Sequence, residues 1–143
     1  TTALDVSVQA QILDLLRTIR QELKTAIILI THDLAITAQM CDRIVVMYAG
    51  QVMESSGTRD LFRAPRHPYT AGLLNSMPRL GHKRDRLEQI PGQPPDLRAL
   101  PVGCRFAPRC AQAETRCGAE EPLLASAGGG RQVRCHFPLA EEP

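Results

Sequence analysis

The sequence predicts an α/β domain followed by a small, irregular, cysteine-rich segment. Apolar residues recur at helical spacing over residues 8–23, which is typical of an amphipathic helix. The unbroken apolar run 26–30 has the character of a strand buried on both faces, as in a parallel sheet. Four of the five cysteines lie beyond residue 100, a clustering that is not a core pattern. The 143 residues, 43% of them hydrophobic, are enough for one ordinary domain or two small ones.

The first predicted element is the amphipathic helix. Asp5 or Ser7 can cap its N-terminus, because the short polar side chains of aspartate and serine accept hydrogen bonds from free backbone N–H groups. We expect one face of this helix to pack against the rest of the domain. Its apolar stripe consists of Val8, Ile12, Leu15, Leu16, Ile19 and Leu23.

The predicted strand that follows ends in a histidine. The run 26–30 continues into Thr31, His32 and Asp33. In open α/β sheets, ligands bind just beyond the carboxyl ends of the strands, which would place His32 at a functional site. The alternative is a histidine that merely ends the strand and caps the next helix, and position alone leaves both interpretations open.

Further short elements complete the first half. Asp33 can cap a short helix that runs to Met40, and residues 44–48 form a second apolar strand. The turn Ala49–Gly50 leads into residues 51–54, which predicts a terminal antiparallel hairpin. A capped helical turn follows at residues 57–62. The two strands lack partners that would cover them, so we expect this half to be marginally stable by itself.

The start of the chain, TTALDVSVQAQIL, together with the later ITHD, resembles the ATP-binding subunits of ABC transporters. The similarity is greatest to the subfamily that serves oligopeptide, dipeptide and nickel importers. It implies that residues 1–64 are the C-terminal part of a P-loop (RecA-like) nucleotide-binding domain. It also implies that Ala3, Leu4 and Asp5 form the D-loop at the interface of two subunits. His32 would be the switch histidine that contacts the terminal phosphate.

Three motifs of this family are absent from the printed sequence. The family order implies a phosphate-binding loop, a signature motif and an Asp-Glu-Pro run before the position of Thr1. Neither Lys24 nor Lys83 follows the glycine pattern that a phosphate loop needs. We therefore interpret the chain as the C-terminal part of a nucleotide-binding subunit. Binding of ATP and Mg²⁺ belongs to the complete subunit, which would also supply the catalytic glutamate.

Prolines after residue 64 indicate a change of domain. In the string RHPYT, Pro68 can begin a helix with His67 at its cap, which favours a capping histidine and a packing tyrosine over a ligand role. The same HPYT string resembles the motif that names the C-terminal extension of oligopeptide and dipeptide transporter ATPases. We assign residues 65–143 to this extension. Within it, residues 78–103 are predicted as a proline-broken connector and residues 125–130 as a flexible loop.

The cysteines form the second candidate site. Disulfides are the least favoured fate, because a nucleotide-binding subunit faces the reducing cytosol. Zinc sites usually draw on tight C-x₂₋₄-C pairs, which are absent here. An iron–sulfur cluster accepts wider loops, so we favour a [4Fe–4S] cluster, with zinc as the alternative. The predicted ligands are separated by five, six and seventeen residues: Cys104, Cys110, Cys117 and Cys135. Cys41 is predicted to be a small buried hydrophobe.

Residues beside the cysteines suggest a cofactor environment. Phe106 and Phe137 each follow a cysteine by two residues and can exclude water from it. His136 is interpreted as a bystander. The string GCRFAPRC resembles the family extension, in which some members carry a [4Fe–4S] cluster. Four arginines adjoin the cysteines and are expected to lower the thiol pKa values: Arg105, Arg109, Arg116 and Arg134.

Charge and hydropathy exclude other classes of function. The net charge of +2 is too small to indicate nucleic-acid binding, and the basic tract 79–116 contains only Phe106 as an aromatic for stacking. The run 26–30 is far shorter than the ~20 residues of a membrane span.

The resemblance implies a peripheral subunit on the cytoplasmic side of the bacterial inner membrane. Its partners would be a second ATP-binding subunit and permease subunits, with an extracytoplasmic solute-binding protein acting indirectly. The alternatives are a free-standing metal or iron–sulfur module and a non-functional truncated remnant.

Overall fold

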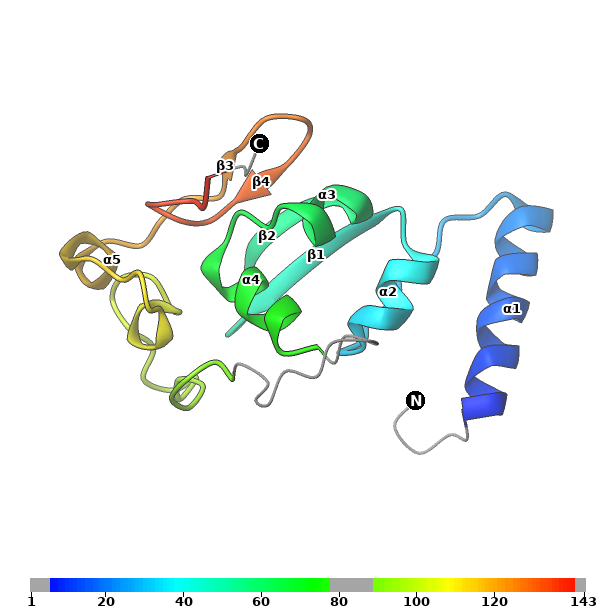
Figure 1. The fold of residues 1–143 in the computed structure, drawn as a ribbon, viewed down its shortest axis with the longest axis horizontal. Helices are drawn as coiled ribbons and strands as arrows, with labels where there is room; N and C mark the ends of the chain where they lie inside the picture. Colours follow the sequence, from blue (N-terminus) through cyan, green and yellow to red (C-terminus); the bar gives the residue numbers. More distant parts are fainter. Residues whose placement is uncertain (1–5, 78–88, 141–143) are drawn as a thin grey trace. The chain divides into compact units, whose positions relative to one another are not determined.

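The computed structural model describes residues 6–77 and 89–140, and the chain divides into two compact units, Thr1–Cys41 and Asp42–Pro143 (Figure 1). This division falls earlier than residue 64, where the sequence suggests a family domain boundary. The reason is that the hairpin of residues 43–57 pairs with a strand near residue 132. The assignment of 1–64 and 65–143 to two family domains stays a prediction.

The first unit contains two helices. Helix α1 spans Val6–Leu23 and helix α2 spans Leu34–Met40, as predicted. Because α1 already includes Ser7, that residue is not its N-cap. The other cap candidate, Asp5, lies outside the described residues, as do Ala3 and Leu4.

The predicted strand at residues 26–30 is wrong for the structure described. These residues form no strand, and the side chains of Ile28 and Ile30 are 91% and 94% exposed. A strand exists only where a neighbouring strand accepts and donates its backbone hydrogen bonds. No described strand pairs with this run, so its backbone is left to water.

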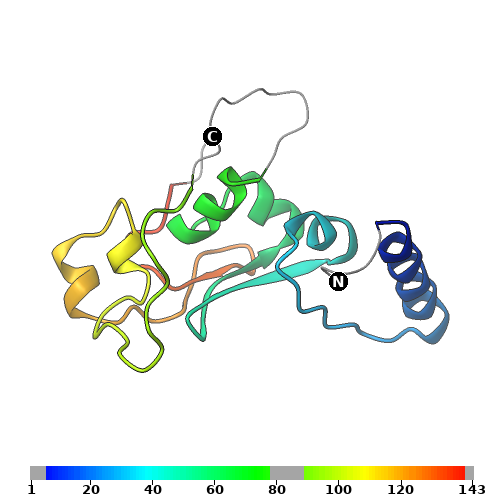
Figure 2. The same ribbon diagram turned by 90° about the horizontal axis from the view of Figure 1, so that it is seen from below.

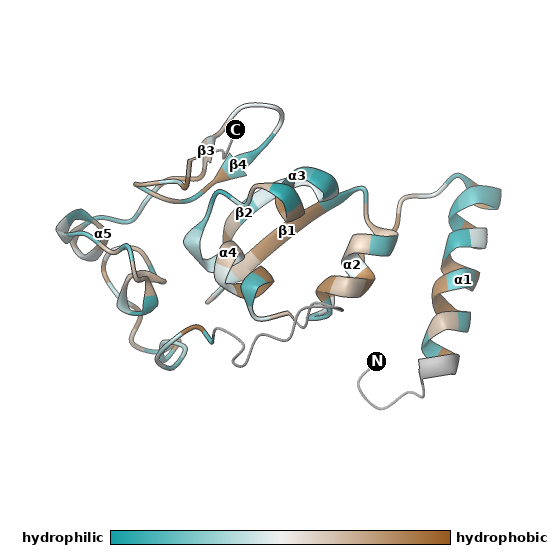
Figure 3. Cartoon of the chain, viewed as in Figure 1, coloured by the Kyte–Doolittle hydropathy of each residue, from teal (hydrophilic) through white to brown (hydrophobic). Residues whose placement is uncertain are grey.

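Packing within the first unit is sparse. One small hollow is lined by Leu16 of α1, by Ile36 of α2 and by Leu29 of the segment between these helices. Among the hydrophobic residues described in this unit, only Ile36 is buried, at 7% exposure. Figure 3 shows apolar and polar residues alternating around α1. The stripe on α1 is therefore amphipathic as predicted, but much of it is not covered.

The second unit is built on a four-stranded antiparallel sheet. Its strands are β1 (Arg43–Tyr48), β2 (Gln51–Gly57), β3 (Ala125–Ser126) and β4 (Gln132–Val133), in the order β1-β2-β4-β3. The predicted hairpin is confirmed. Every described strand pair is antiparallel, so the protein is α/β but the predicted parallel sheet is not present in this part of the chain.

A tight two-residue turn closes the β1–β2 hairpin. Tyr48 pairs with Gln51, and the intervening Ala49 and Gly50 have φ angles of 47° and 81°. Positive φ at both positions matches the right-handed twist of the strands. The hairpin also contains a bulge, because Met47 pairs with Val52 while Val46 pairs with Glu54. This leaves Met53 between two pairs of the ladder.

Two short helices cover one face of the hairpin (Figures 1 and 2). Helix α3 spans Thr58–Arg63 and α4 spans Pro68–Asn75, both close to their predicted positions. Their buried side chains Leu61 and Leu74 contribute to the core of this unit. The core therefore lies between the hairpin and the segments that follow it.

The rest of the unit is largely irregular. A 3₁₀ turn, η1, spans Ala107–Arg109, and a short helix, α5, spans Thr115–Ala119. Residues 89–106 have no regular element, as predicted, and 78–88 lie outside the described residues. The segment 125–130, predicted as a flexible loop, instead forms β3 and the turn into β4, with three glycines at positive φ. In the described residues, no helix has both the length and the hydropathy needed to cross a membrane.

Candidate metal centre

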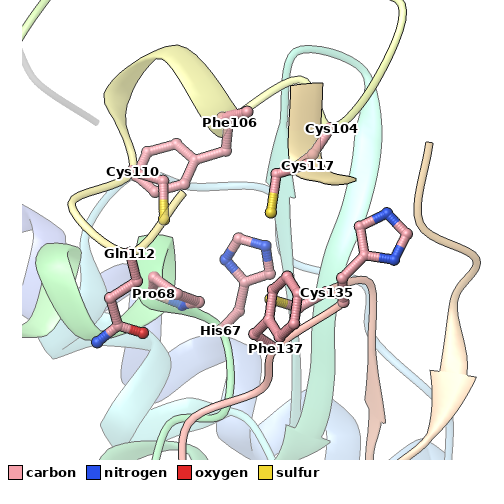
Figure 4. A pocket seen from close by; sticks show the side chains of 11 residues that line it. His67, Pro68, Cys104, Phe106, Cys110, Gln112, Cys117, Cys135 and Phe137 are labelled. Carbon is pink, nitrogen blue, oxygen red and sulfur yellow. The ribbon is translucent and has the colours of Figure 1, made fainter. Parts of the chain in front are cut away.

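The four clustered cysteines line one pocket of the second unit, as Figure 4 shows. Cys104 and Cys110 flank η1, Cys117 lies on α5, and Cys135 comes two residues after the end of β4. Cys104 and Cys117 are buried, whereas Cys110 and Cys135 are partly buried. The structure thus brings together the four thiols that the sequence grouped only by their spacing.

A glycine that the sequence reasoning did not single out allows this assembly. The backbone N–H of Cys104 donates to the carbonyl of Cys117 at 2.8 Å. A Cβ atom on Gly103 would lie 2.3 Å from that carbonyl oxygen and 2.7 Å from the carbonyl carbon of Gly118. Since both contacts are backbone atoms, no side chain fits at residue 103. In the sequence, the glycine directly before Cys104 is the feature that could have indicated this constraint.

The four arginines beside the cysteines do not point at the thiols. Arg105 donates to the carbonyl of Ala49, and Arg109 donates to the carbonyls of Ile90 and Pro91. Their role is therefore to hold the irregular segments onto the hairpin.

The two remaining arginines differ in their partners. Arg134 donates to the carbonyls of Val52 and Pro122, and Arg116 pairs with Glu120 on the surface of α5. Arg116 does interact with a thiol, since the charge of Cys117 helps to raise the pKa of Arg116. The prediction that these arginines lower the thiol pKa values is wrong for Cys104, Cys110 and Cys135, because no arginine side chain among the described residues contributes to the pKa shift of these thiols.

Burial has the opposite effect on the thiols. It raises the pKa of Cys104 and of Cys110, and it raises the pKa of Cys135 to about 11. The other three clustered cysteines add to the shift at Cys135, because each would repel its thiolate. These three thiols are therefore protonated at neutral pH, and a bound metal would have to displace their protons.

Aromatic rings close the pocket. Phe106 and Phe137 both line it, as predicted, with Phe106 only 3% exposed. The ring of Phe106 packs against Tyr48 and Tyr69, with centroids 5.3 and 5.2 Å apart. This cluster fastens the cysteine-bearing loops to the hairpin and keeps water from the thiols.

His67 combines two roles at this pocket. Its Nδ1 accepts a hydrogen bond from the N–H of Tyr69 at 2.9 Å and so caps α4, as predicted. The same ring lines the cysteine pocket and is 1% exposed. Burial lowers its pKa to about 4, partly opposed by the backbone of Arg134. The sequence identified the cap but not the place of the ring among the thiols.

A buried carboxylate fixes the position of His67. Glu54, 1% exposed, accepts from the backbone N–H groups of Arg66 and His67 at 2.8 and 2.9 Å. Arg131 lies 3.9 Å from the same carboxylate. The sequence analysis missed this role, because along the chain Glu54 is only one residue of a predicted strand with alternating polarity.

The four thiols share a pocket without converging on one point. In residues 6–77 and 89–140, no three cysteine, histidine or acidic side chains converge closely enough to hold one metal ion. The four thiols instead line a common pocket from three separate segments, and no carboxylate lines it.

The other predicted site residues are not part of this pocket. His32 is exposed and directly precedes Asp33, whose Oδ1 accepts from the N–H groups of Ala35 and Ile36. Asp33, not His32, is therefore the cap of α2. Cys41 belongs to the first unit and is partly exposed, so the prediction that it is fully buried is wrong. His136 lines the pocket, and its Nε2 lies 2.9 Å from the carbonyl of Glu120.

Comparison with known proteins shows what the chain is related to. Residues 53–117 match a family model described as the C-terminal region of oligopeptide/dipeptide transporters. The chain is 49% identical to the dipeptide transport ATP-binding protein DppD of Escherichia coli over 139 residues, which cover 97% of the chain and 42% of that protein.

Two further relatives give the same result. The oligopeptide transport ATP-binding protein AppD of Bacillus subtilis is 49% identical over 142 residues, which cover 99% of the chain and 43% of that protein. The oligopeptide transport ATP-binding protein OppD of Escherichia coli is 50% identical over 141 residues, with coverage of 99% and 42%. The chain thus spans less than half the length of the curated relatives it matches. It belongs to the oligopeptide/dipeptide ABC transporter family, and it corresponds to the C-terminal part of the family's ATP-binding proteins.

Proposed function

We propose that this chain is part of an ATP-binding subunit that energises the uptake of peptides, or of a related small solute, through a bacterial inner-membrane permease. The observation that carries the proposal is identity of about half over nearly the whole chain to proteins named for dipeptide and oligopeptide transport. The complete subunit would bind ATP and Mg²⁺ and act peripherally on the cytoplasmic side of the membrane. Its partners would be a second ATP-binding subunit and the permease, with a solute-binding protein acting indirectly.

Within that subunit, His32 is proposed to contact the terminal phosphate, and Asp5, with Ala3 and Leu4, to contact the second subunit. The exposure of His32 supports this, because its ring is neither packed nor used to cap α2. A donor aimed at charge that develops during hydrolysis is worth about 3 kcal/mol, or a hundredfold in rate. We therefore expect His32→Ala to slow hydrolysis while nucleotide binding survives.

A chimera tests this function. The 139 matched residues of Escherichia coli DppD are replaced by this chain, and dipeptide-dependent growth is measured in a strain lacking DppD. We expect growth with the native chain and its loss with His32→Ala, whereas Gln39→Ala on the exposed side of α2 should grow normally. Failure of a stably expressed native chimera to restore growth would contradict the transport proposal.

We further propose that Cys104, Cys110, Cys117 and Cys135 hold a [4Fe–4S] cluster, with zinc as the alternative. Their shared pocket supports this, as does their position on three separate segments. When bound, the cluster would supply a redox-active group and a covalent connection between these segments. The chain's own contribution is to present four thiols from a dry, aromatic pocket.

Metal analysis of anaerobically purified protein tests the site. We expect iron and acid-labile sulfide, and we expect serine at any one of the four positions to reduce both and to loosen the fold, because metal binding and folding are coupled. Cys41→Ser is the matched control, since this cysteine lies in the other unit. Zinc without sulfide would support the alternative, and folded protein without either metal would remove the proposal.

A further inference from the structure

The imidazole of His67 is held in one orientation at the cysteine pocket. Its Nδ1 accepts from the N–H of Tyr69 at 2.9 Å, and its ring packs against Phe106 with centroids 5.8 Å apart. Its own backbone N–H is bound by Glu54. In Figure 4 the ring and the sulfur atoms of Cys110 and Cys117 face the same hollow. The ring therefore has little freedom to turn away from the thiols.

The hydrogen bond at Nδ1 also sets the tautomer. A ring nitrogen that accepts from an N–H carries no proton, so the proton of the neutral ring lies on Nε2. His67 thus presents one fixed N–H donor on the side of the ring opposite the α4 cap.

This donor has no partner of its own. Nε2 is buried and has no hydrogen-bond partner among the described residues, although the backbone of Arg134 acts on the ring and partly opposes the lowering of its pKa. A buried donor that is left unsatisfied destabilises the folded protein. The other polar side chains that line the pocket are the four cysteine thiols, Gln112 and His136. The thiols are weak acceptors until they lose their protons. The site therefore contains a donor that matches an electron-rich sulfur atom.

We propose that the Nε2–H of His67 donates a hydrogen bond to a sulfur atom of an iron–sulfur cluster held by the four cysteines, an inference that rests on the metal site proposed above. His67 is then a tuning residue and not a ligand. Hydrogen bonds to the sulfurs help to set the reduction potential of such clusters. A fixed donor stabilises the more negative, reduced state, so it raises the potential.

The test compares three variants in the anaerobically purified chain. His67→Asn keeps an oxygen that can accept from the N–H of Tyr69 but is too short to supply the donor. His67→Gln restores an N–H donor at about the distance of Nε2. His136→Asn is the matched control, because this second pocket-lining imidazole already has a partner in the carbonyl of Glu120. Iron and sulfide content are measured first, and the midpoint potential is then obtained by spectroscopic titration.

We expect His67→Asn to retain iron and to shift the midpoint to more negative values by about 59 mV, which is a tenfold change in the one-electron equilibrium. His67→Gln should recover part of the shift, and His136→Asn should show none. An unchanged midpoint in iron-loaded His67→Asn would overturn the inference. Loss of the cluster from both His67 variants would also overturn it, because His67 would then serve only the fold. Absence of iron from the native chain would instead refute the metal site itself.

Discussion

Similar apolar segments are exposed in the first unit and buried in the second. In residues 6–41, Ile28 and Ile30 are more than nine-tenths exposed. In residues 42–140, Ile44 and Val46 of β1 are each 6% exposed. The difference is that β1 pairs along its whole length with β2 and is covered by neighbouring helices, whereas the run 26–30 has no pairing strand.

This contrast shows that an apolar run does not become a strand through its own composition. Its backbone groups need partners, and its side chains need a covering layer. Even β1 leaves Val45 and Met47 more than half exposed on its other face. The first unit thus consists of helices with little core, whereas the second has a buried core around its sheet. Four predictions test and sharpen this comparison.

The largest expected effect is at Gly103, in the second unit. Gly103→Ala places a methyl group against the backbone of Cys117 and Gly118, so the loop must move and lose the hydrogen bond between Cys104 and Cys117. We expect a loss of about 3 kcal/mol in the free energy of unfolding, measured with chemical denaturant. Gly118→Ala is the control, because its Cβ would meet no atom within 4 Å. Equal stability of the two variants would contradict the described packing.

The next effect concerns the buried carboxylate at the start of α4. Glu54→Gln replaces one acceptor oxygen by an NH₂ group that faces the N–H of Arg66 or His67, and it removes the charge near Arg131. We expect a cost of about 2–4 kcal/mol in thermal unfolding, because a buried charge loses its partner. Asp96→Asn alters an exposed salt bridge with Arg98 and should change stability by less than about 1 kcal/mol. A similar small change at Glu54 would show that its network is not structural.

A smaller effect distinguishes the turns of the two units. Ala49 has a φ of 47° in the β1–β2 turn, and Lys24 has a φ of 48° just after α1. Ala49→Asn suits the left-handed conformation and should stabilise the second unit by about 0.5–1 kcal/mol. Lys24→Gly should increase the helicity of α1 without shifting the unfolding transition of the second unit. Near-UV circular dichroism, which reports on aromatic side chains, can follow that transition. A shift of that transition by Lys24→Gly would mean that the two units unfold together.

The smallest effect is expected where the apolar run is exposed. Ile30→Ser should change the free energy of unfolding of this chain by less than about 0.5 kcal/mol, because the side chain is 94% exposed. Val46→Ser, at a 6% exposed position, should cost several-fold more. Repeating both in the DppD chimera tests whether the rest of the protein covers the run. In the chimera, the loss in the free energy of unfolding caused by Ile30→Ser should approach the loss caused by Val46→Ser.

Local sequence signals predicted those parts of the fold that depend on neighbours in the chain. The stripe on α1, the caps Asp33 and His67, and the Ala49–Gly50 turn all depend on residues within a few positions. The grouping of the four cysteines was also visible from their spacing. Whether they bind metal stays a prediction.

Long-range contacts decided what the sequence could not. Gly103 is constrained by the carbonyl of Cys117, Glu54 by the start of α4, and Arg109 by carbonyls near residue 90. The sequence places Arg109 beside Cys110, and this adjacency led to the wrong pKa prediction. Side-chain direction depends on where distant backbone acceptors lie, and those positions are set only when the segments pack.

The sequence by itself determined the helices, the hairpin, the family and the four candidate ligands. Only the tertiary structure decided that residues 26–30 have no strand partner among the described residues, that Arg105, Arg109 and Arg134 bind backbone carbonyls, and that His67 faces the thiols. Propensity, capping and turn chemistry act over three or four residues and can be read along the chain. Burial, pairing and orientation need atoms that come from far away in the sequence, so they exist only in the folded protein.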